Sequence, residues 1–279
     1  MNNCFFVSDL HGNRERYEKL FNIILNERPI AVLLGGDLLP HSNINPNFID
    51  DYLTNNLLSL KEKLNKLYPR ILLILGNDDA RSDEPSIMNA VQKNIFEYLH
   101  MRSTEFFGRK IFGYSFTPPS PFLLKDWEKY DLSRFTEFGS ISPEEGKRSV
   151  EIPLEEIKYS TIKEDLELLT GSENLSEDII LFHGPPYKTN LDRAALDGKI
   201  IDHVQVDLHV GSIAIKKFIE KKQPKITLHG HIHESARITG SWKDKIGKTF
   251  CFGAAHDGKE LAVVKFDPFK PENAERILY

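Results

Sequence analysis

The sequence predicts an α/β fold in which strands buried on both faces alternate with amphipathic helices. The main observation is a set of short apolar runs bounded by glycine and polar residues, which is typical of strands in a covered sheet. The runs are Phe5 to His11, Ala31 to Asp37, Ile71 to Asp78, Ile179 to His183 and Ile226 to His233. Each run ends in side chains that bind divalent metals, and open α/β sheets place ligands beyond the carboxyl ends of their strands. We therefore expect these side chains to meet at one rim.

Two amphipathic segments connect the first three runs. Residues 13–27 carry apolar side chains at helical spacing, with Asn13 as the expected N-cap and Pro29 just beyond the end. Residues 48–67 place leucines on one stripe and are followed by Pro69. Helices that link parallel strands in this way are predicted to be the crossovers of the sheet.

Two further helices and a second sheet are predicted later in the chain. Residues 160–170 contain a capping box formed by Thr161 and Glu164, and residues 212–222 begin at a candidate N-cap, Ser212. Short strands of the second sheet are expected over residues 96–113, 249–252 and 261–266.

The segment from Phe116 to Pro153, called the excursion below, fits neither the helical nor the strand period. Its five prolines stand among aromatic and charged residues, at Pro118, Pro119, Pro121, Pro143 and Pro153. We predict loops and short helices there. Because long ordered loops often cover functional sites, the excursion is our candidate for a lid. No repeat or linker divides the sequence, so residues 1–279 are predicted to form a single domain.

Composition and charge limit the class of protein. With 40% hydrophobic and 28% charged residues, the chain has an ordinary globular composition. Its net charge of −5 tells against general binding to nucleic acid and favours small substrates, although one local cationic site could hold a phosphate. No leader-like or membrane-spanning run is found, so we expect a cytoplasmic protein without a membrane anchor. Cys4 and Cys251 lie in apolar runs and fit a reducing compartment.

Oxygen and nitrogen donors at the ends of the runs are suited to two divalent cations. In Asp9-Leu10-His11 the carboxylate ends a strand and the imidazole follows on the turn, so both can share one cation. The two glycines before Asp37 allow a tight turn and leave its carboxylate free to bridge two cations. The predicted ligands are Asp9, His11, Asp37, Asn77, His183, His231 and His233.

Taken in order, these motifs resemble those of the calcineurin-like metallophosphoesterases. The shared elements are Asp-x-His, Gly-Asp, Gly-Asn-x-Asp, a His followed by Gly, and Gly-His-x-His, and they extend from Asp9 to His233. The resemblance implies an α/β fold with a four-layer αββα sandwich, in which two mixed sheets are flanked by helices. It also implies two metal sites that share Asp37. One would use Asp9, His11, Asp37 and His233, and the other Asp37, Asn77, His183 and His231.

The resemblance further implies a metal-dependent phosphoric ester hydrolase that acts by attack of a metal-bridging hydroxide. Its catalytic residues would be Asp9, Asp37, Asn77 and Asp78. We expect two manganese ions, with iron, zinc or nickel as alternatives, because mixed carboxylate, amide and imidazole ligands accept all of these metals.

One position departs from the family pattern. The His that usually follows Gly-Asn is thought to help protonate the leaving group, and Asp78 stands there in this chain. We therefore expect a phosphodiesterase acting on a small or nucleotide-like substrate, with a phosphomonoesterase as the alternative. Asp78 could act as an acid only if burial raised its pKa, and Asp79 is expected to orient a neighbouring group. Pro40 stands where the purple acid branch needs tyrosine, which tells against a ferric tyrosinate centre.

Side chains near the predicted ligands are candidates for binding the substrate. The stretch after His183 must pass close to the site, and its polar residues are either phosphate contacts or solvated loop charges. The candidates are Tyr187, Lys188 and Arg193, together with Arg14 and with His209, which precedes a helix N-terminus. The histidines His41, His100 and His229 are expected to be ordinary core or surface residues.

Two other classes compete with the enzyme. A binding scaffold would keep the fold without turnover, as the retromer scaffold subunit of this superfamily does, but such scaffolds usually lose metal ligands that this sequence retains. A nuclease would need a basic groove and added nucleic-acid-binding segments, which the acidic composition does not favour. A homodimer is reasonable because the second sheet is expected to have exposed edges.

Overall fold

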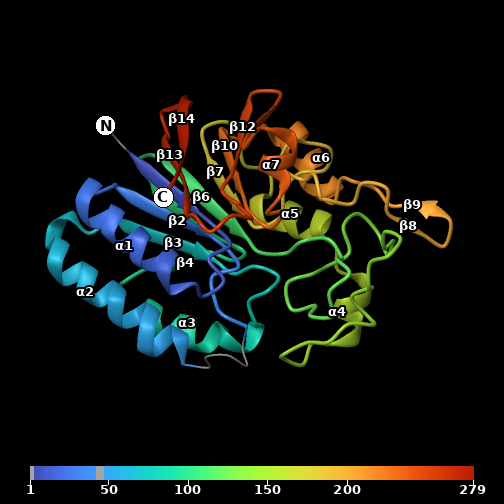
Figure 1. Ribbon diagram of the computed structural model, residues 1–279, viewed down its shortest axis with the longest axis horizontal. Coiled ribbons are helices and arrows are strands. Elements are labelled where there is room, and N and C mark those ends of the chain that lie inside the picture. The colour runs from blue at the N-terminus through green and yellow to red at the C-terminus, as the bar shows by residue number, and fades with distance from the viewer. Residues whose placement is uncertain (1–2, 42–46) are drawn as a thin grey trace.

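The chain folds into four layers, with helices outside and two sheets facing each other inside (Figure 1). The computed structural model describes residues 3–41 and 47–279. The expected αββα sandwich is confirmed. None of the described helices offers the length and hydropathy that crossing a membrane requires.

The first sheet combines strands from both ends of the chain. It contains β1 (Cys4–Val7), β2 (Ala31–Gly35), β3 (Arg70–Ile74), β4 (Glu97–Tyr98), β13 (Ala262–Asp267) and β14 (Lys270–Leu278). The spatial order is β14-β13-β1-β2-β3-β4, and the neighbours from β1 to β4 run parallel. As a result, the carboxyl ends of β1, β2 and β3 lie side by side at one edge.

The second sheet is built in the same way around parallel central strands. It contains β5 (Arg102–Phe106), β6 (Arg109–Tyr114), β7 (Ile179–Phe182), β10 (Ile226–His229), β11 (Lys243–Ile246) and β12 (Thr249–Gly253). Its order is β11-β12-β10-β7-β6-β5, with antiparallel strands only at the two edges. A separate short hairpin is formed by β8 (Ile200–Ile201) and β9 (Val204–Gln205).

Helices cover the outer face of each sheet. The longer ones are α1 (Arg14–Glu27), α2 (Asn55–Leu64) and α3 (Glu84–Val91) beside the first sheet, and α5 (Ile162–Thr170) and α6 (Ile213–Lys222) beside the second. The shorter ones are η1 (Phe48–Thr54), η2 (Asn65–Leu67), η3 (Arg81–Asp83), α4 (Leu154–Tyr159) and α7 (Ser235–Thr239). The predicted helix starts are confirmed, because Asn13 and Ser212 cap α1 and α6 and Thr161 forms a capping box with Glu164 at α5.

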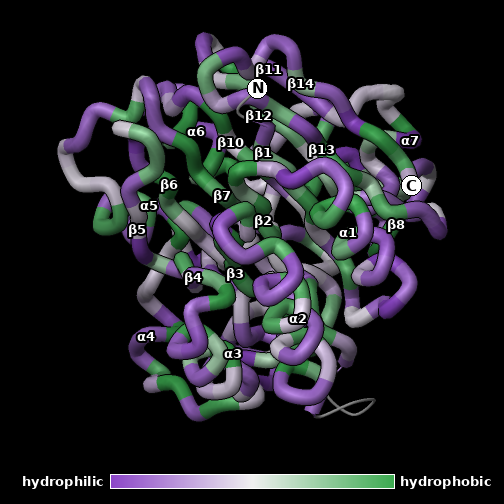
Figure 2. The backbone as a smooth tube through the Cα atoms, turned by 90° about the vertical axis from the view of Figure 1, so that its left-hand side faces the viewer, coloured by the Kyte–Doolittle hydropathy of each residue, from purple (hydrophilic) through white to green (hydrophobic). Residues whose placement is uncertain are grey.

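Alternate residues of each central strand fill two different parts of the core. Phe6 and Leu33 point between the sheets, where they meet residues such as Leu181 of the second sheet. Phe5 and Val32 point the other way, toward the helices. Figure 2 shows hydrophobic residues along the central strands and an alternation with hydrophilic residues along the outer helices. This double burial explains why the strands are continuous apolar runs.

The strands predicted for the second sheet divide between both sheets. Residues 102–106, 109–113 and 249–252 belong to the second sheet as expected, but residues 262–266 lie in β13 beside β1 in the first sheet, and residues 97–98 form its edge strand β4. The prediction was wrong for these two segments because an apolar run specifies burial on both faces, and either sheet provides it. The five apolar runs that end in predicted metal ligands likewise come from both sheets, and their carboxyl ends meet at one rim.

The excursion consists of turns and isolated bridges. Every residue from 116 to 153 is described, and none is helical; the helix α4 begins only at Leu154, so the short helices predicted within the excursion are wrong. Frequent prolines remove the backbone donors that a helix would need. Lys125 and Glu128 form a fully buried ion pair within the excursion, and the Asp131 carboxylate accepts a 2.7 Å hydrogen bond from the backbone N–H of Ile213 in α6. The excursion is therefore anchored to the body of the protein.

Candidate metal centre

The predicted ligands lie on loops that follow β1, β2 and β3 of one sheet and β7 and β10 of the other. Several of them have left-handed backbone, with φ values of 57° at Asp9, 45° at His11, 51° at Asp37 and 75° at His231. This conformation is uncommon outside glycine, although Asp, Asn and His tolerate it better than other residues. Backbone strain of this kind gathers at functional sites, where the surrounding structure holds it in place.

Two glycines allow the loops after β2 and β3 to approach closely. Gly36 has a φ of 93°, and a Cβ atom there would lie 2.5 Å from Nδ1 of His183. A Cβ atom on Gly76 would overlap the Asp37 carboxylate. Larger residues at these positions would push apart the loops that carry the predicted ligands.

One group of donors joins the loops after β1, β2 and β10. The ligand atoms of Asp9, His11, Asp37 and His233 all lie within 4.8 Å of one another. His233 Nε2 is 3.3 Å from Asp9 Oδ1 and 3.2 Å from His11 Nε2. His11 Nε2 is in turn 3.9 Å from Asp37 Oδ2.

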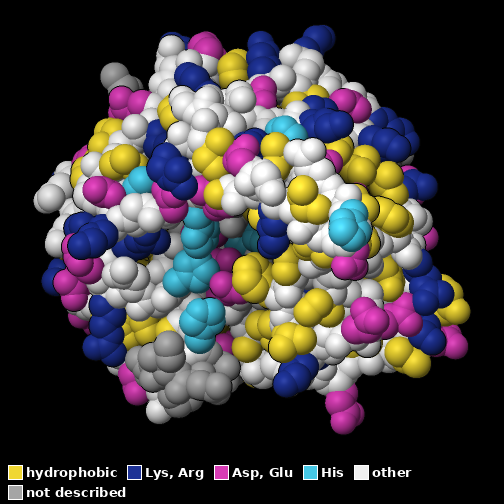
Figure 3. All heavy atoms as spheres, turned by 45° about the vertical axis from the view of Figure 1, so that its right-hand side comes forward, with side chains coloured by type: hydrophobic (Ala, Val, Ile, Leu, Met, Phe, Trp, Pro, Cys, Tyr) yellow, Lys and Arg dark blue, Asp and Glu magenta, His cyan; other side chains and the backbone are white. Residues whose placement is uncertain are grey.

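A second group shares Asp37 with the first. It consists of Asp37, His183 and His231, whose ligand atoms also lie within 4.8 Å of one another. His183 Nε2 is 3.3 Å from Asp37 Oδ2 and 2.9 Å from Asn77 Oδ1. The structure thus brings together all the predicted ligands in the two sets that the resemblance implies. Figure 3 shows histidine and acidic side chains gathered at a hollow in the surface.

The buried acidic and histidine side chains of the two groups shift one another's pKa values. Burial would raise the pKa of both carboxylates, but the hydrogen bond and charge of His233 lower the pKa of Asp9, and the charge of His183 lowers that of Asp37. Burial would lower the pKa of His183, but Asp37 outweighs it and raises this pKa to about 10. Burial and the nearby His183 lower the pKa of His231 to about 3. Ionised carboxylates therefore lie beside the neutral imidazole of His231.

Backbone groups fix the orientation of these side chains. The His183 ring donates from Nδ1 to the carbonyl oxygen of Gly35 at 2.8 Å, which leaves Nε2 to face Asp37. The Asp9 carboxylate accepts hydrogen bonds from the Ser8 hydroxyl and, at 3.0 Å, from the backbone N–H of His231. These contacts leave the donor atoms little freedom to turn away.

The donor set fits divalent cations of the first transition row. Imidazole nitrogens, carboxylate oxygens and an amide oxygen are the ligands that manganese, iron, zinc and nickel share. The crowding of two buried carboxylates, Asp9 and Asp37, is also electrostatically costly unless positive charge lies between them. A cation in each group would supply that charge.

The two acidic residues after Asn77 have different surroundings. The Asp78 carboxylate is partly exposed, with Oδ2 3.7 Å from His11 Nδ1, and burial and the Asp37 charge raise its pKa. Asp79 is fully buried and accepts hydrogen bonds from the backbone N–H groups of Leu38, Leu39 and Gly76 at 2.7 to 3.2 Å. Burial and Asp37 raise the pKa of Asp79 to about 8. Asp79 thus orients neighbouring loops, as predicted.

The candidate substrate residues contact other protein groups. The Tyr187 hydroxyl donates to Asp207 at 2.5 Å, and the Arg193 guanidinium pairs with Asp197 at 2.6 Å. The Arg14 guanidinium lies over the Tyr52 ring, 4.9 Å from its centroid. Lys188 is exposed, and among the described residues its ammonium group has no hydrogen-bond or ion-pair partner.

His209 leads to a residue that the sequence reasoning missed. Its Nδ1 lies 2.8 Å from the carboxylate of Asp192, which is fully buried and also accepts hydrogen bonds from the backbone N–H groups of Lys188, Thr189 and Gly211. Asp192 thereby holds the loop that follows His183 in shape. The Thr-Asn-Leu-Asp sequence carried a turn signal that could have identified it.

Arg16 was also missed, and no sequence signal pointed to it. Its guanidinium donates from Nη1 to the carbonyl oxygen of Asp9 at 2.8 Å and from Nη2 to that of Gly258 at 2.6 Å. Because both acceptors are backbone atoms, residue types alone could not reveal the contact. The histidine expected to be structural, His229, is confirmed as such, since its ring bonds the Gly184 carbonyl oxygen and the Thr227 hydroxyl.

Comparison with known proteins identifies the family and supports the fold. A family model described as calcineurin-like phosphoesterase matches residues 4–235. The uncharacterized protein MJ1162 of Methanocaldococcus jannaschii is 39% identical over 85 residues, which cover 30% of this chain and 33% of that protein. The alignment therefore spans about a third of this curated relative.

Solved structures share the architecture at low sequence identity. The protein TT1561 of Thermus thermophilus is 15% identical with a TM-score of 0.58, over 99% of this chain and 98% of that chain. A putative 5'-nucleotidase from Staphylococcus aureus, solved in complex with alpha-ketoglutarate, is 14% identical with a TM-score of 0.52. That match covers 99% of this chain and 54% of the nucleotidase chain. At such identities the likeness shows the fold alone.

Proposed function

Because this chain belongs to the calcineurin-like phosphoesterase family, we propose that it is a metal-dependent phosphoric ester hydrolase that works through a binuclear centre as a phosphodiesterase on a small or nucleotide-like substrate. The observation that carries the binuclear proposal is the position of Asp37, whose carboxylate belongs to both groups of donors. A side chain shared in this way is suited to bridge two cations.

In this proposal, Asp9, His11, Asp37 and His233 hold one cation, and Asp37, Asn77, His183 and His231 hold the other. Two cations held there would supply Lewis acidity toward a phosphoryl oxygen and would lower the pKa of a water molecule. We propose manganese as the metal on the chemistry of the donors.

The chain's own residues prepare the site in three ways. His183 would present Nε2 to a cation, which would take the place of the proton that Asp37 favours there, because its Nδ1 is held by the Gly35 carbonyl oxygen. Asp79 keeps the loops after β2 and β3 together through three backbone hydrogen bonds. The exposed ammonium group of Lys188 stands on the loop after His183, and we assign it to the substrate phosphate, with Tyr187, Arg193 and His209 beside it and Arg14 on α1.

The preference for diesters is based on Asp78. An ester with an activated leaving group depends less on a proton donor, whereas the alkoxide that leaves a simple monoester needs one. Because its pKa is raised, Asp78 is protonated more often than an exposed carboxyl group would be. It still does not replace the imidazolium that the family's usual His would supply at this position. Monoesters with poor leaving groups should therefore react slowly.

The test compares bis-p-nitrophenyl phosphate with p-nitrophenyl phosphate on metal-stripped protein, before and after manganese is restored. We expect manganese-dependent turnover with a higher kcat/KM for the diester. Asn77→Ala should lose this turnover, whereas Asn273→Ala, which changes an exposed residue of β14, should keep it. Preference for the monoester would contradict the diesterase proposal, and turnover without added metal would contradict the metal-dependent mechanism.

A further inference from the structure

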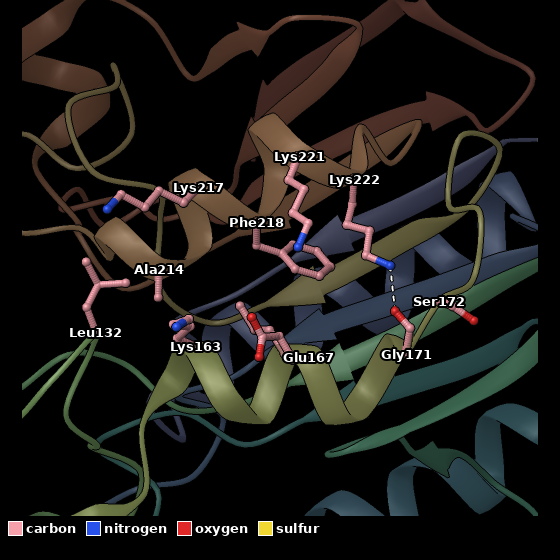
Figure 4. A pocket seen from close by; sticks show the side chains of 11 residues that line it. Leu132, Lys163, Glu167, Gly171, Ser172, Ala214, Lys217, Phe218, Lys221 and Lys222 are labelled. Atoms are coloured by element: carbon pink, nitrogen blue, oxygen red, sulfur yellow. Dashed lines mark hydrogen bonds between the residues drawn. The ribbon is translucent and has the colours of Figure 1, made fainter.

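Helices α5 and α6 lie side by side on the outer face of the second sheet and leave a groove between them (Figure 4). The cavity in this groove has a volume of about 610 Å³. This size falls in the range of about 300–1,000 Å³ that is usual for small-molecule sites. Its lining contains none of the predicted metal ligands, so it is separate from the metal centre.

The floor of the groove is apolar. Leu166 of α5 and Ala214 and Phe218 of α6 contribute to it, and each of these side chains is at least nine-tenths buried in the core below. Leu132 of the excursion closes one end. Such a floor offers contact to an aliphatic or aromatic body but few hydrogen bonds with which to recognise a polar one.

Lysines surround this floor. Lys163, Lys217, Lys221 and Lys222 line the groove together with a single acidic residue, Glu167. The ammonium group of Lys222 is used within the protein, because it donates to the Gly171 carbonyl oxygen at 2.6 Å. Among the residues that the structure describes, the other three lysines have no ion pair within 4.0 Å and no side-chain hydrogen bond.

This arrangement contrasts with the rest of the chain. The whole protein has 36 basic and 41 acidic residues, yet cations prevail around the groove. Like charges brought this close repel one another, and an anion between them would relieve that repulsion. An apolar floor with a cationic rim is complementary to a molecule that has an apolar body and an anionic head.

We propose that the groove between α5 and α6 binds a small amphipathic anion, with its alkyl chain against Leu132 and Phe218 and its carboxylate or phosphate head among Lys163, Lys217 and Lys221. The two head groups share the chemistry that the lysines recognise. Binding here does not depend on the proposed hydrolytic activity, because no predicted metal ligand or substrate residue lines the groove.

The experiment is isothermal titration calorimetry of the full chain with dodecanoate and with dodecylphosphonate, each below its critical micelle concentration; the C–P bond of the phosphonate is not a substrate for a phosphoesterase. We expect saturable 1:1 binding of at least one of them, and the stronger of the two identifies the head group. Dodecyltrimethylammonium has the same chain with a cationic head and should bind at least tenfold more weakly. Equal binding of this cation, or no binding of either anion, would overturn the proposal.

Substitutions that reverse the charge of two lysines then test whether the anion binds in this groove. Lys217→Glu combined with Lys221→Glu should weaken binding of the anion by roughly tenfold, because two attractive charges beside the anionic head become repulsive ones. The matched control is Lys63→Glu with Lys66→Glu, which reverses one exposed lysine at the end of α2 and one in η2 and should leave binding unchanged. Lys217→Gln with Lys221→Gln gives the same test with less repulsion, so a loss of folding in the first variant would not hide the result. If this Gln variant bound the anion as tightly as the wild type does, the anion would not bind at Lys217 and Lys221.

Discussion

Oδ1 of Asp79 accepts a 2.7 Å hydrogen bond from the backbone N–H of Leu39, and this bond ties the loop after β3 to the loop after β2. The other carboxylate oxygen accepts from the N–H groups of Leu38 and Gly76. Asp37 and Asn77 lie directly beside these anchored positions in the sequence. Asp79 therefore controls the distance between two proposed metal ligands without belonging to either donor group.

Asp79→Asn should weaken both the fold and the metal centre. The amide would replace one accepting oxygen by an N–H₂ group that faces a backbone donor, which costs about 2 kcal/mol of unfolding free energy. Because the loops would separate, we expect manganese affinity to fall by roughly 10–100-fold. Urea unfolding and manganese titration check the two effects. Unchanged affinity together with reduced stability would show that Asp79 supports the fold only.

Asp78→His should shift the preference toward monoesters. An imidazolium next to the reacting phosphate would protonate a poor leaving group better than Asp78 does, so the ratio of kcat/KM for phenyl phosphate to that for bis-p-nitrophenyl phosphate should rise by roughly tenfold or more. The control is Asp78→Asn, which keeps the size of the side chain and cannot supply a proton. If Asp78→His leaves the ratio at the wild-type value, residue 78 does not determine the choice of substrate.

His100 should make the protein sensitive to acid. Its ring packs against Tyr114, Phe116 and Trp127, and burial, aided by the positive charge of Arg81, lowers its pKa from 6.5 to about 3. Between these two values the unfolded chain binds a proton that the folded chain does not, so stability falls as the pH falls. The loss is at most about 1.4 kcal/mol per pH unit.

His100→Gln keeps a hydrogen-bond acceptor but cannot titrate. Both proteins are unfolded with urea between pH 7 and pH 4. As the pH is lowered, the unfolding free energy of the wild type should therefore fall relative to that of this variant. The control His203→Gln alters an exposed histidine and should behave like the wild type. A difference that is constant with pH would show that His100 does not titrate on unfolding.

Local patterns in the sequence predicted the strands and helices because the spacing of apolar residues in a segment shows which of its side chains are buried. The cap at Asn13 and the capping box at Thr161 required only neighbouring residues, and the structure contains both. The convergence of His183 and Asp37 was predictable because ligands gather at the carboxyl ends of parallel strands. The sheet to which β13 belongs was not predictable, since its residues would be buried equally well in either sheet.

The contacts around the site were harder to foresee for a related reason. Arg16 bonds the carbonyl oxygens of Asp9 and Gly258, and any residue type could have supplied those acceptors. The pairing of Arg193 with Asp197 likewise follows from the course of its loop. Contacts to backbone atoms and within irregular loops depend on tertiary geometry, which no period in the sequence encodes.

Counting the bound metal ions shows whether two cations share Asp37. Metal-stripped protein is loaded with manganese, freed of excess ions by gel filtration, and analysed for metal per chain by mass spectrometry. The proposal predicts two manganese ions per wild-type chain, none retained by Asp37→Ala, and two retained by Asp50→Ala, which changes an exposed acidic residue. Hydrolysis of the diester should disappear only in Asp37→Ala. A single ion in the wild type, or two ions and full activity in Asp37→Ala, would contradict the shared site.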